Sequence, residues 1–493
     1  MASHAEARVL DVAKFMQGLR FTPFHRRILF LSCLVTFFDG LDFSLIAYTL
    51  PYIRDEMALD AAMMGNVSMA AFVGQMVGSL FGSYIADIIG RRPVIIVSTL
   101  LAAVLTFVTG MAQTPESLIA LRLAGGLAIG GLLAPVWSLN IESMPKAMRA
   151  TSVTIIMLGF SAGGAAAGQV ANYFAPADGF YAAHLASLGL AGVLPPTGWH
   201  TVFFFCGLLT GVLAFILLFT LPESTRWMVA KGKPASAITP MLHRFDPDFD
   251  DANYTKFELS DERKTTGGNS PLAKMAELFH GWLAYITPLI WLAYFFSSFA
   301  IYLKSSFGVL FLEELGLSVE LSTNIGSIGG LAGAVAGVFL LMFTEKRGPA
   351  WITLAPLIGI PFLLLIGVGA VLNGPAFIPV VLIGSILVGA GHAAVISITS
   401  IYYPSAVRAT GGGWASFMAK FAAVAAPWVG SRLFLGSEEK VLDGYLFSAV
   451  CLFGIVVCIL ALSHFARRLR ADQGDEEDAN RAGTDSKGSP AAA

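Results

Sequence analysis

Apolar residues fill most of the chain in long runs, and short polar segments separate these runs. The hydrocarbon core of a bilayer is about 30 Å thick, so a helix that crosses it needs about 20 apolar residues. Twelve runs come close to this length, at residues 28–50, 66–86, 94–111, 118–141, 152–172, 201–221, 283–303, 322–343, 351–372, 377–400, 410–431 and 445–463. The pattern predicts an all-α membrane protein with twelve transmembrane helices.

Lysine and arginine are distributed very unequally between the polar segments. If the N-terminus lies in the cytoplasm, the cytoplasmic segments hold 25 of these residues and the outer loops hold only Arg54 and Lys440. Cytoplasmic loops of membrane proteins carry the excess of basic residues. We therefore expect a multi-pass protein of the plasma membrane (the inner membrane if the source is bacterial) with both termini in the cytoplasm.

The polar segments divide the chain into five parts. We expect a cytoplasmic N-terminal segment (1–27), an N-terminal six-helix bundle (28–221), a cytoplasmic inter-bundle loop (222–282), a C-terminal six-helix bundle (283–464) and a disordered cytoplasmic tail (465–493). Residues 180–196 are fairly apolar, but a thirteenth span there would place the basic residues of 222–282 outside the cell. We interpret this segment as an extended outer loop with room for an interfacial helix.

Composition excludes several classes of protein. The 493 residues are 56% hydrophobic and only 13% charged, too few charges to cover a water-soluble surface, and the net charge of −2 argues against nucleic-acid binding. The four cysteines show no C-x-x-C spacing, so we expect no metal or redox site. Neither a phosphate-binding loop nor a catalytic constellation is present. We therefore expect that the protein is neither an ATP-driven pump nor an enzyme and that it has no cofactor. We expect protons as the coupling ion.

Two loop signatures of the first half recur in the second half. Asp87 and Gly90 follow the second span, and Glu345 and Gly348 follow the eighth, each 258 residues later (345 − 87). Pro-x-x-x-Arg-Ala-Thr follows the fourth span at 145–151 and the tenth at 404–410, 259 residues later (404 − 145). Duplicated cytoplasmic loops predict two pseudo-symmetric six-helix bundles, an architecture of secondary transporters.

Charged residues of these loops are candidates for a gate between helices. An acid near a helix N-terminus can pair with a nearby arginine, and such a pair can latch neighbouring helices in one state and release them in another. A purely topogenic role of the arginines stays open as the alternative. The gating candidates are Asp87, Gly90, Arg91, Arg92, Glu142, Arg149, Glu345 and Arg408.

The same segments resemble a known superfamily. Residues 82–92 (GSYIADIIGRR) are similar to the loop signature of the major facilitator superfamily, with one extra residue between the first glycine and the acid. Residues 122–130 (RLAGGLAIG) resemble its fourth-helix motif, and 221–226 (LPESTR) resemble the segment that closes the first half in sugar and aromatic-acid porters. The resemblance covers about residues 20–465 and implies the major facilitator fold.

Within that superfamily, the chain resembles the aromatic acid:proton symporter family. Residues 39–42 (DGLD) are similar to its D-G-x-D signature, and 403–411 (YPSAVRATG) together with Lys420 fit its second half. Three positions depart from the family pattern: Ile401 stands in place of an acid, Phe-Gly-Val at 307–309 in place of Trp-Leu-Pro, and Lys304 in place of an apolar residue. The departures bear on the substrate more than on the fold.

Asp39 and Asp42 lie deep inside the first span. They are about 16 Å and about 21 Å from its start at Ile28, at about 1.5 Å per residue, and they share one helix face. A charge near the bilayer centre costs about 2.5–3.5 kcal/mol on insertion scales. Because two neighbouring carboxylates cannot both stay ionised at low cost, one can take a proton outside and release it inside. We predict that this pair, with Arg122 in the fourth span, couples transport to protons; a fixed ion pair with Arg122 or Lys420 is the alternative.

The other polar residues in the spans indicate an anionic substrate. Lys420, midway along the eleventh span, is the leading candidate for binding its carboxylate. Lys304 either adds a second positive group or extends to the outer interface as a lipid-facing lysine. His392 either shuttles protons or packs as a neutral, hydrogen-bonded side chain. Further candidates are Trp137, Phe38, Trp414 and Tyr402 for stacking on an aromatic ring, and Asn140, Gln169 and Asn172 for lining a cavity.

The charges in the spans predict the import of an organic acid anion together with protons, and the family resemblance implies an aromatic carboxylate carried by alternating access. Two alternatives stay open: a major facilitator porter for a sugar or an aliphatic dicarboxylate, and a membrane sensor that binds without transporting. The expected partners are the organic anion, protons and the lipid bilayer. We expect a monomer.

Overall fold

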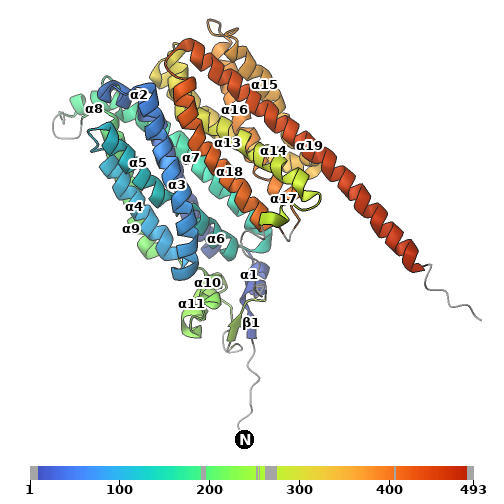
Figure 1. Cartoon of the computed structure of the whole chain (residues 1–493). Coiled ribbons are helices and arrows are strands. Elements are labelled where there is room, and N and C mark those ends of the chain that lie inside the picture. The colour runs from blue at the N-terminus through green and yellow to red at the C-terminus, as the bar shows by residue number, and fades with distance from the viewer. Residues whose placement is uncertain are drawn as a thin grey trace, which may run out of the picture. The chain divides into compact units, whose positions relative to one another are not determined.

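The computed structural model describes residues 9–189, 196–250, 254, 256–260, 275–404 and 407–485 (Figure 1). Its helices divide into two compact units. Unit 1 comprises Met1–Thr266, Tyr302–Ala334 and Ala423–Gly444, and unit 2 comprises Gly267–Ile301, Val335–Ala422 and Tyr445–Ala493. Eleven of the described helices are long and apolar enough to cross a membrane. Helix α18 (Arg408–Leu433) covers the remaining predicted span.

The first six predicted spans are all helical and all belong to unit 1. Gly130 and Gly131 break the fourth span into two helices, because glycine has a low helix propensity. The eight-residue α8 (Phe180–Ser187) lies in the predicted outer loop and is too short to cross a bilayer; residues 190–195 of that loop lie outside the described residues. The spans are α2 (Pro23–Met57), α3 (Ala61–Ile89), α4 (Arg91–Thr109), α5 (Pro115–Gly130) with α6 (Leu133–Ser143), α7 (Arg149–Phe174) after the 3-10 turn η1 (Lys146–Met148), and α9 (Trp199–Thr220).

Short polar residues begin these helices where the chain turns. The carboxylate of Asp60 accepts a hydrogen bond (2.7 Å) from the backbone N–H of Met63 at the start of α3. Thr114 and Ser117 bond each other's backbone N–H groups at the start of α5. Each bond satisfies a backbone N–H that the first turn of a helix leaves unpaired. The capping residues therefore fix where the transmembrane helices start.

Glycines allow the helices of unit 1 to pack backbone against backbone. A Cβ added at Gly40 of α2 would overlap the carbonyl oxygen of Phe160 in α7, and one at Gly163 of α7 would overlap that of Phe37 in α2. Gly126 of α5 lies in the same way against the carbonyl of Ala71 in α3. Such close approach is typical of membrane helices, in which small residues line the interfaces. The helix pairs α2–α7 and α3–α5 are thereby fixed at short distance.

Four of the later helices contribute to both units. In α13, α14, α18 and α19, one end belongs to unit 1 and the remainder to unit 2, whereas α15 and α16 belong to unit 2 alone. Within unit 2, Gly391 of α16 packs against Pro356 of α15. The helices are α13 (Leu283–Glu314), α14 (Val319–Arg347), α15 (Leu354–Gly367) after the 3-10 turn η3 (Pro349–Thr353), α16 (Phe377–Val395) with α17 (Ile398–Tyr402), α18 and α19 (Glu438–Asp485).

Helix α19 continues through the segment for which composition indicated a disordered tail. It ends at Asp485, about 20 residues beyond the predicted end of the last span. Each of these residues lengthens the helix by about 1.5 Å. Residues 466–485 are rich in alanine, arginine, glutamate and aspartate. Alanine, arginine and glutamate have high helix propensity, which continues the helix without any apolar face. Residues 486–493 of the predicted tail lie outside the described residues.

Unit 1 also contains a small folded body, the end cap, made from two segments that the sequence suggested were polar connections. It consists of β1 (Val9–Asp11), α1 (Val12–Gly18), α10 (Thr225–Ala230), α11 (Ala235–Phe245) and β2 (Lys256–Glu258). Strands β1 and β2 pair in parallel. Met16, Leu242 and Phe245 share a buried apolar cluster with Ile28 of α2. The few apolar residues in the described parts of 1–27 and 222–282 therefore fold together, and their spacing is too sparse to detect beside the transmembrane runs.

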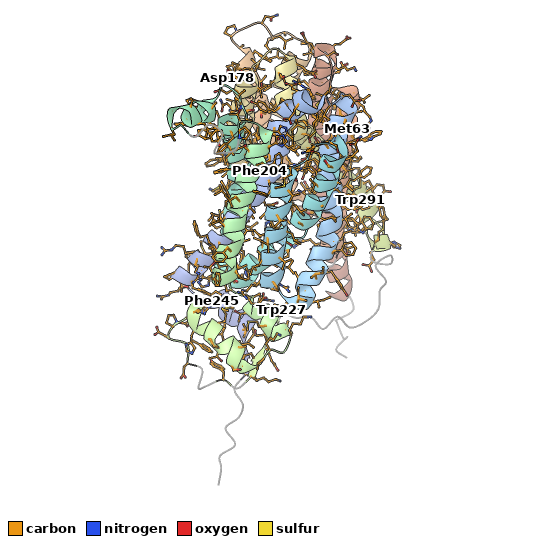
Figure 2. The ribbon with its side chains drawn as sticks, turned by 90° about the vertical axis from the view of Figure 1, so that its left-hand side faces the viewer. Met63, Asp178, Phe204, Trp227, Phe245 and Trp291 are labelled. Atoms are coloured by element: carbon orange, nitrogen blue, oxygen red, sulfur yellow. The ribbon has the colours of Figure 1, made fainter. Side chains whose placement is uncertain are left out.

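The end cap marks one end of the helices of unit 1. Trp227 of α10 and Phe245 of α11 lie at this end, and Met63 and Asp178 lie at the opposite end (Figure 2). The loop signature at 82–92 connects α3 to α4 at the cap end, where Trp227 Nε1 donates a hydrogen bond (3.1 Å) to the carbonyl of Asp87. The cap therefore contacts the loop for which we predicted a gating function.

Two adjacent glycines of α5 provide a test of the packing. A Cβ at Gly126 would collide with the Ala71 backbone, whereas a Cβ at Gly125 would have no atom within 4 Å. We predict that Gly126→Ala destabilises the protein by about 1–3 kcal/mol through overpacking. Gly125→Ala should be neutral or stabilising by up to about 1 kcal/mol, because alanine is the better helix former. Thermal unfolding of both purified variants measures the difference, and equal melting temperatures would contradict the packing.

Candidate functional site

The predicted proton-coupling residues meet inside unit 1. Asp42 is 6% exposed and Arg122 of α5 is 5% exposed. Arg122 Nη1 lies 3.6 Å from Asp42 Oδ2, and the hydroxyl of Thr106 in α4 donates a hydrogen bond to Asp42 Oδ1. Two opposite charges so deeply buried stabilise each other where neither has access to water. The ion pair joins α2 to α5, and the hydrogen bond joins α2 to α4.

Asp39, one turn earlier on α2, has different surroundings. It is 3% exposed, and neither of its carboxylate oxygens has a hydrogen-bond partner among the residues that the structure describes. Asp42 and the phenol of Tyr302 in α13 both lie near enough to interact with it electrostatically. The two aspartates of one motif are therefore distinct: Asp42 is paired with a cation, and Asp39 is not.

A cluster of aromatic side chains, the ring cluster, lies one turn beyond Asp39 in unit 1. Phe43 of α2 is centred 5.5 Å from Phe72 of α3 and 5.4 Å from Phe160 of α7. Tyr302 is centred 6.0 Å from Phe43 and 5.1 Å from Phe72. The sequence analysis missed these four residues, because phenylalanine is common in every span. The spacing of Phe43 four residues after Asp39 was the one available signal, since it places both on the same helix face.

Several predicted substrate-binding residues belong to unit 2. The ring of Trp414 in α18 stacks at 5.9 Å and 28° on Trp291 of α13. His392 Nδ1 and the Ser297 hydroxyl are hydrogen-bonded at 2.9 Å. Lys420 lies in α18, less than two turns after Trp414. Unit 2 thus holds Lys420 and Trp414 on one helix, α18, and the indole ring that stacks on Trp414 comes from α13.

Tyr402 of α17, predicted to stack on an aromatic ring, forms a hydrogen bond through its hydroxyl. It lies 2.9 Å from the hydroxyl of Ser463 in α19, and the side chain is 7% exposed. This hydrogen bond satisfies a polar group that burial would otherwise leave unpaired.

The predicted gating residues of the first half form a connected network at the cap end. Arg91 Nη2 lies 3.0 Å from Asp87 Oδ1 and 3.0 Å from Glu142 Oε1, so that it joins α3 to α6. Glu142 also accepts a hydrogen bond from the hydroxyl of Ser224, which begins α10. Arg92 donates to the carbonyl of Leu221 (2.8 Å). Ionic and neutral hydrogen bonds together link the α3–α4 loop, α6 and the end cap.

Glu223 completes this network, although it was not among the gating candidates. Its carboxylate accepts hydrogen bonds from the backbone N–H groups of Arg91 (3.0 Å) and Arg92 (3.2 Å) at the start of α4, where the helix dipole also favours a negative charge. Burial raises the pKa of Glu223, while the N–H groups of Ser224, Arg92 and Arg91 and the charge of Arg91 act in the opposite direction. The resemblance of 221–226 to a family segment was the sequence signal for it. Gly90 lies beside the same carboxylate, at a backbone angle (φ +112°) that favours glycine.

The repeated signatures have the same local geometry in both halves. Arg149 Nε donates to the carbonyl of Met144, five residues earlier (3.3 Å), and Arg408 Nε donates to the carbonyl of Tyr403, also five residues earlier (3.2 Å). The internal repeat therefore extends to individual hydrogen bonds. The side chain of Glu345, another gating candidate, lies outside the described residues.

Comparison with known proteins identifies the fold that carries this site. The family model described as Major Facilitator Superfamily matches residues 32–427. The chain belongs to the major facilitator superfamily. It is a membrane transporter and not an enzyme, as its family and its relatives show.

Its relatives within the superfamily include transporters of aromatic acids. The chain is 28% identical over 463 residues to the 4-hydroxybenzoate transporter PcaK of Pseudomonas aeruginosa, covering 92% of this chain and 97% of the relative. It is 27% identical to a gallate transporter of Pseudomonas putida (94% and 96% covered) and 26% identical to a benzoate transport protein of Acinetobacter baylyi (85% and 86% covered). The resemblance seen in the D-G-x-D signature is thus confirmed across most of the chain.

Solved structures of the superfamily have the same fold. A bacterial homologue of the human lysosomal transporter Spinster, in an inward-facing and occupied conformation, matches with a TM-score of 0.67 and 16% identity, covering 91% of this chain and 98% of that chain. The xylose transporter XylE from E. coli, in a partially occluded inward-open conformation, matches with a TM-score of 0.62 and 18% identity, covering 90% and 99%. At this identity the likeness concerns the fold alone.

The structure also places the other predicted site residues of this major facilitator protein. Phe38 packs beside the buried cluster that connects α2 to the end cap. Asn140 is fully buried and donates a hydrogen bond (3.1 Å) to the carbonyl of Val136, one turn earlier. Trp137 of α6 is 37% exposed. Lys304 lies within α13, two residues after Tyr302, in the part of that helix that belongs to unit 1.

Polar contacts connect the helix ends of unit 1 that lie opposite the cap. Arg54 of α2 donates two hydrogen bonds to the carboxylate of Glu313 in α13 (3.1 and 2.8 Å). Gln169 and Asn172 of α7, predicted to line a cavity, both donate to the side-chain oxygen of Asn324 in α14 (3.0 and 3.2 Å). We call this set of bonds the opposite-end contacts. They join the first-half helices to the ends of α13 and α14.

We predict that Glu223→Ala destabilises the protein by about 1–3 kcal/mol, because it leaves buried N–H groups at the start of α4 without an acceptor. Glu223→Gln should cost less, since its amide oxygen still accepts a hydrogen bond. Glu439→Ala is the matched control at the start of α19, where only the dipole interaction of about 0.3–1 kcal/mol is lost. Thermal unfolding of the three variants measures these losses of stability. If Glu223→Ala were no less stable than Glu439→Ala, the result would contradict the network.

The bidentate pair at the opposite end gives a second test. Removing either Arg54 or Glu313 should lower stability by about 1.5–3 kcal/mol, the usual value of a hydrogen bond to a charged group. The exchanged double variant Arg54→Glu, Glu313→Arg should recover part of that loss. Asp55→Ala removes the exposed partner of Arg54 and should cost at most about 1 kcal/mol. Additive single losses, without recovery in the exchanged variant, would show that the two side chains do not interact.

Proposed function

We propose that this major facilitator protein is a proton-coupled transporter that imports an aromatic carboxylate by alternating access. Support for the substrate class comes from the 4-hydroxybenzoate, gallate and benzoate transporters that share 26–28% of its sequence over most of both chains. Support for proton coupling comes from one observation in the structure. Asp39 is a buried carboxylate without a hydrogen-bond partner among the described residues. It lies one turn from Asp42, which forms an ion pair with Arg122.

The contrast between the two aspartates assigns them different tasks. Asp42 is compensated by Arg122 and Thr106, so it stays ionised at low cost and fixes the helices around it. Asp39 has no such compensation, and a neutral carboxylic acid is far easier to bury than its anion. In the proposed cycle, Asp39 takes up a proton when it is open to the outside and releases it when it is open to the cytoplasm. Protonation also removes the repulsion that an approaching anion would meet.

We propose that Lys420 binds the substrate carboxylate from unit 2. An ammonium group can donate charge-assisted hydrogen bonds to a carboxylate, and a cation within a membrane span is a candidate for a functional role. The indole rings of Trp291 in α13 and Trp414 in α18 stack on each other. Such a pair of rings is suited to contact with an aromatic ring of the substrate. A monoanion that moves with one proton is electroneutral, and each further proton would add about 2.3 kcal/mol per 100 mV of membrane potential.

The proposed orientation places the end cap in the cytoplasm of the cell. The segments that form the cap carry most of the basic residues of unit 1, and Arg54 lies at the opposite end. This distribution follows the positive-inside rule and supports a location in the plasma membrane with both termini inside. The opposite-end contacts then lie on the outer side of the membrane.

Uptake by purified protein in liposomes with an imposed inward pH gradient tests the proposal. Asp39→Asn and Asp42→Asn should each abolish accumulation of labelled 4-hydroxybenzoate. Asp39→Asn should still exchange labelled for unlabelled substrate, because exchange moves no net proton. Asp42→Asn should lose exchange as well, because it leaves Arg122 buried without its anion. Asp178→Asn, an exposed position beyond α7, is the control.

Full gradient-driven accumulation by both aspartate variants would contradict the proposal. Competition with glucose and with succinate separates the two other porter functions, since an aromatic acid porter should be inhibited by neither. Ligand binding without any flux in the wild type would favour a sensor.

A further inference from the structure

The surroundings of Asp39 suggest which part of an aromatic substrate it meets. The ring cluster of Phe43, Phe72, Phe160 and Tyr302 lies one turn from it, and all five residues belong to unit 1. Phe43 is tilted at 51° against Phe72 and at 57° against Phe160, and Tyr302 meets Phe43 and Phe72 edge to face, at 65° and 75°. Such edge-to-face contacts extend readily to one more ring. The carboxylate of Asp39 is a buried acceptor near these rings, without a hydrogen-bond partner among the residues that the structure describes.

An acceptor next to aromatic side chains complements a phenol. A phenolic hydroxyl donates a strong hydrogen bond to a carboxyl oxygen, and the ring that carries it packs on aromatic neighbours. A carboxylate, in contrast, has no donor and would repel Asp39 whenever that residue is ionised. The chemistry near Asp39 therefore favours binding of the hydroxyl end of a hydroxylated aromatic acid and disfavours binding of its carboxylate end.

We propose that Asp39 and the ring cluster form a subsite for the ring hydroxyl, so that the transporter prefers hydroxylated aromatic acids to unsubstituted benzoate. This inference rests on the proposed function and assigns Asp39 a second role besides carrying the proton. A site built to bond a substrate hydroxyl rejects the analogue without it, because the buried acceptor then stays unpaired. The same hydrogen bond holds the substrate at the residue whose protonation state changes, which ties ring recognition to proton uptake.

Gly40 and Gly163 explain why the subsite keeps its shape. They bring the backbones of α2 and α7 into direct contact on either side of Asp39. Phe160 is the α7 residue whose carbonyl meets Gly40, so the packing that positions Asp39 also positions one ring of the cluster. A rigid arrangement of this kind is what selective recognition of a small group requires.

Exchange in liposomes without a pH gradient tests the subsite apart from proton coupling. We expect the wild type to show a KM for 4-hydroxybenzoate at least tenfold below that for benzoate. In Asp39→Leu, which has no acceptor, this ratio should fall to about threefold or less. Asp39→Asn keeps an acceptor oxygen, so it should retain most of the preference while losing gradient-driven accumulation.

Phe43→Leu tests the ring contacts. It should raise the KM of both acids about two- to tenfold. The ratio of the two KM values should stay unchanged, because both substrates lose the same contact with the ring of Phe43. Phe215→Leu, on an exposed face of α9, is the control and should change neither KM. Circular dichroism and thermal unfolding establish that each variant is folded.

The possible outcomes separate the inference from the function on which it rests. Equal KM values for the two acids in the wild type, or an unchanged preference in folded Asp39→Leu, would overturn the subsite and leave aromatic acid transport standing. Exchange of no aromatic acid at all by the wild type would overturn both. The expected loss of preference in Asp39→Leu with its retention in Asp39→Asn supports hydroxyl recognition as a task distinct from proton transfer.

Discussion

The ion pair between Asp42 and Arg122 is the interaction on which the rest of the site depends. Inside a membrane protein neither charge has water to solvate it, so each is stable only because the other is present. Their pairing, supported by Thr106, joins α2, α4 and α5 and gives the first transmembrane helix a fixed orientation. That orientation places Asp39, one turn away on the same helix, where the described part of the chain shows no ion pair or hydrogen bond to its carboxylate. A fixed pair beside an unpaired carboxylate is an arrangement suited to carrying a proton.

Helix packing and loop bonding hold this arrangement in place. The glycine contacts of α2 with α7 and of α3 with α5 fix the positions of four helices around the site without long side chains between them. At the cap end, Arg91 joins Asp87 to Glu142, and Glu223 caps α4. At the other end, Arg54 and Glu313 join α2 to α13. Unit 1 is thus connected at both ends of its helices by charged groups.

The sequence predicted the fold well because hydrophobicity determines which segments can cross a membrane. Length, charge asymmetry and repeated loops were sufficient to find the spans, the internal repeat and the superfamily, and residues 39–42 indicated the relatives. The end cap was missed because its apolar residues are few and pair across more than 200 positions, as Val9 does with Lys256. The extension of α19 was missed because composition says little about helices without an apolar face.

Within the site, sequence alone could not separate Asp39 from Asp42. Both are acidic, both lie on one face of α2, and the positions of Arg122 and Thr106 on two other helices distinguish them. The ring cluster was missed for a similar reason, since Phe43, Phe72, Phe160 and Tyr302 come from four helices and have no shared spacing. Long-range neighbours decide the role of such residues, and one sequence does not reveal them.

The central claim is that Asp39 changes its protonation state during transport whereas Asp42 does not. Infrared difference spectra of the purified transporter in lipid, with and without 4-hydroxybenzoate at neutral pH, report carboxylic acid groups directly through their C=O stretching band. The account predicts a substrate-dependent change in this band that disappears in Asp39→Asn and persists in Asp178→Asn. A band that persists in Asp39→Asn and disappears in Asp42→Asn would contradict it.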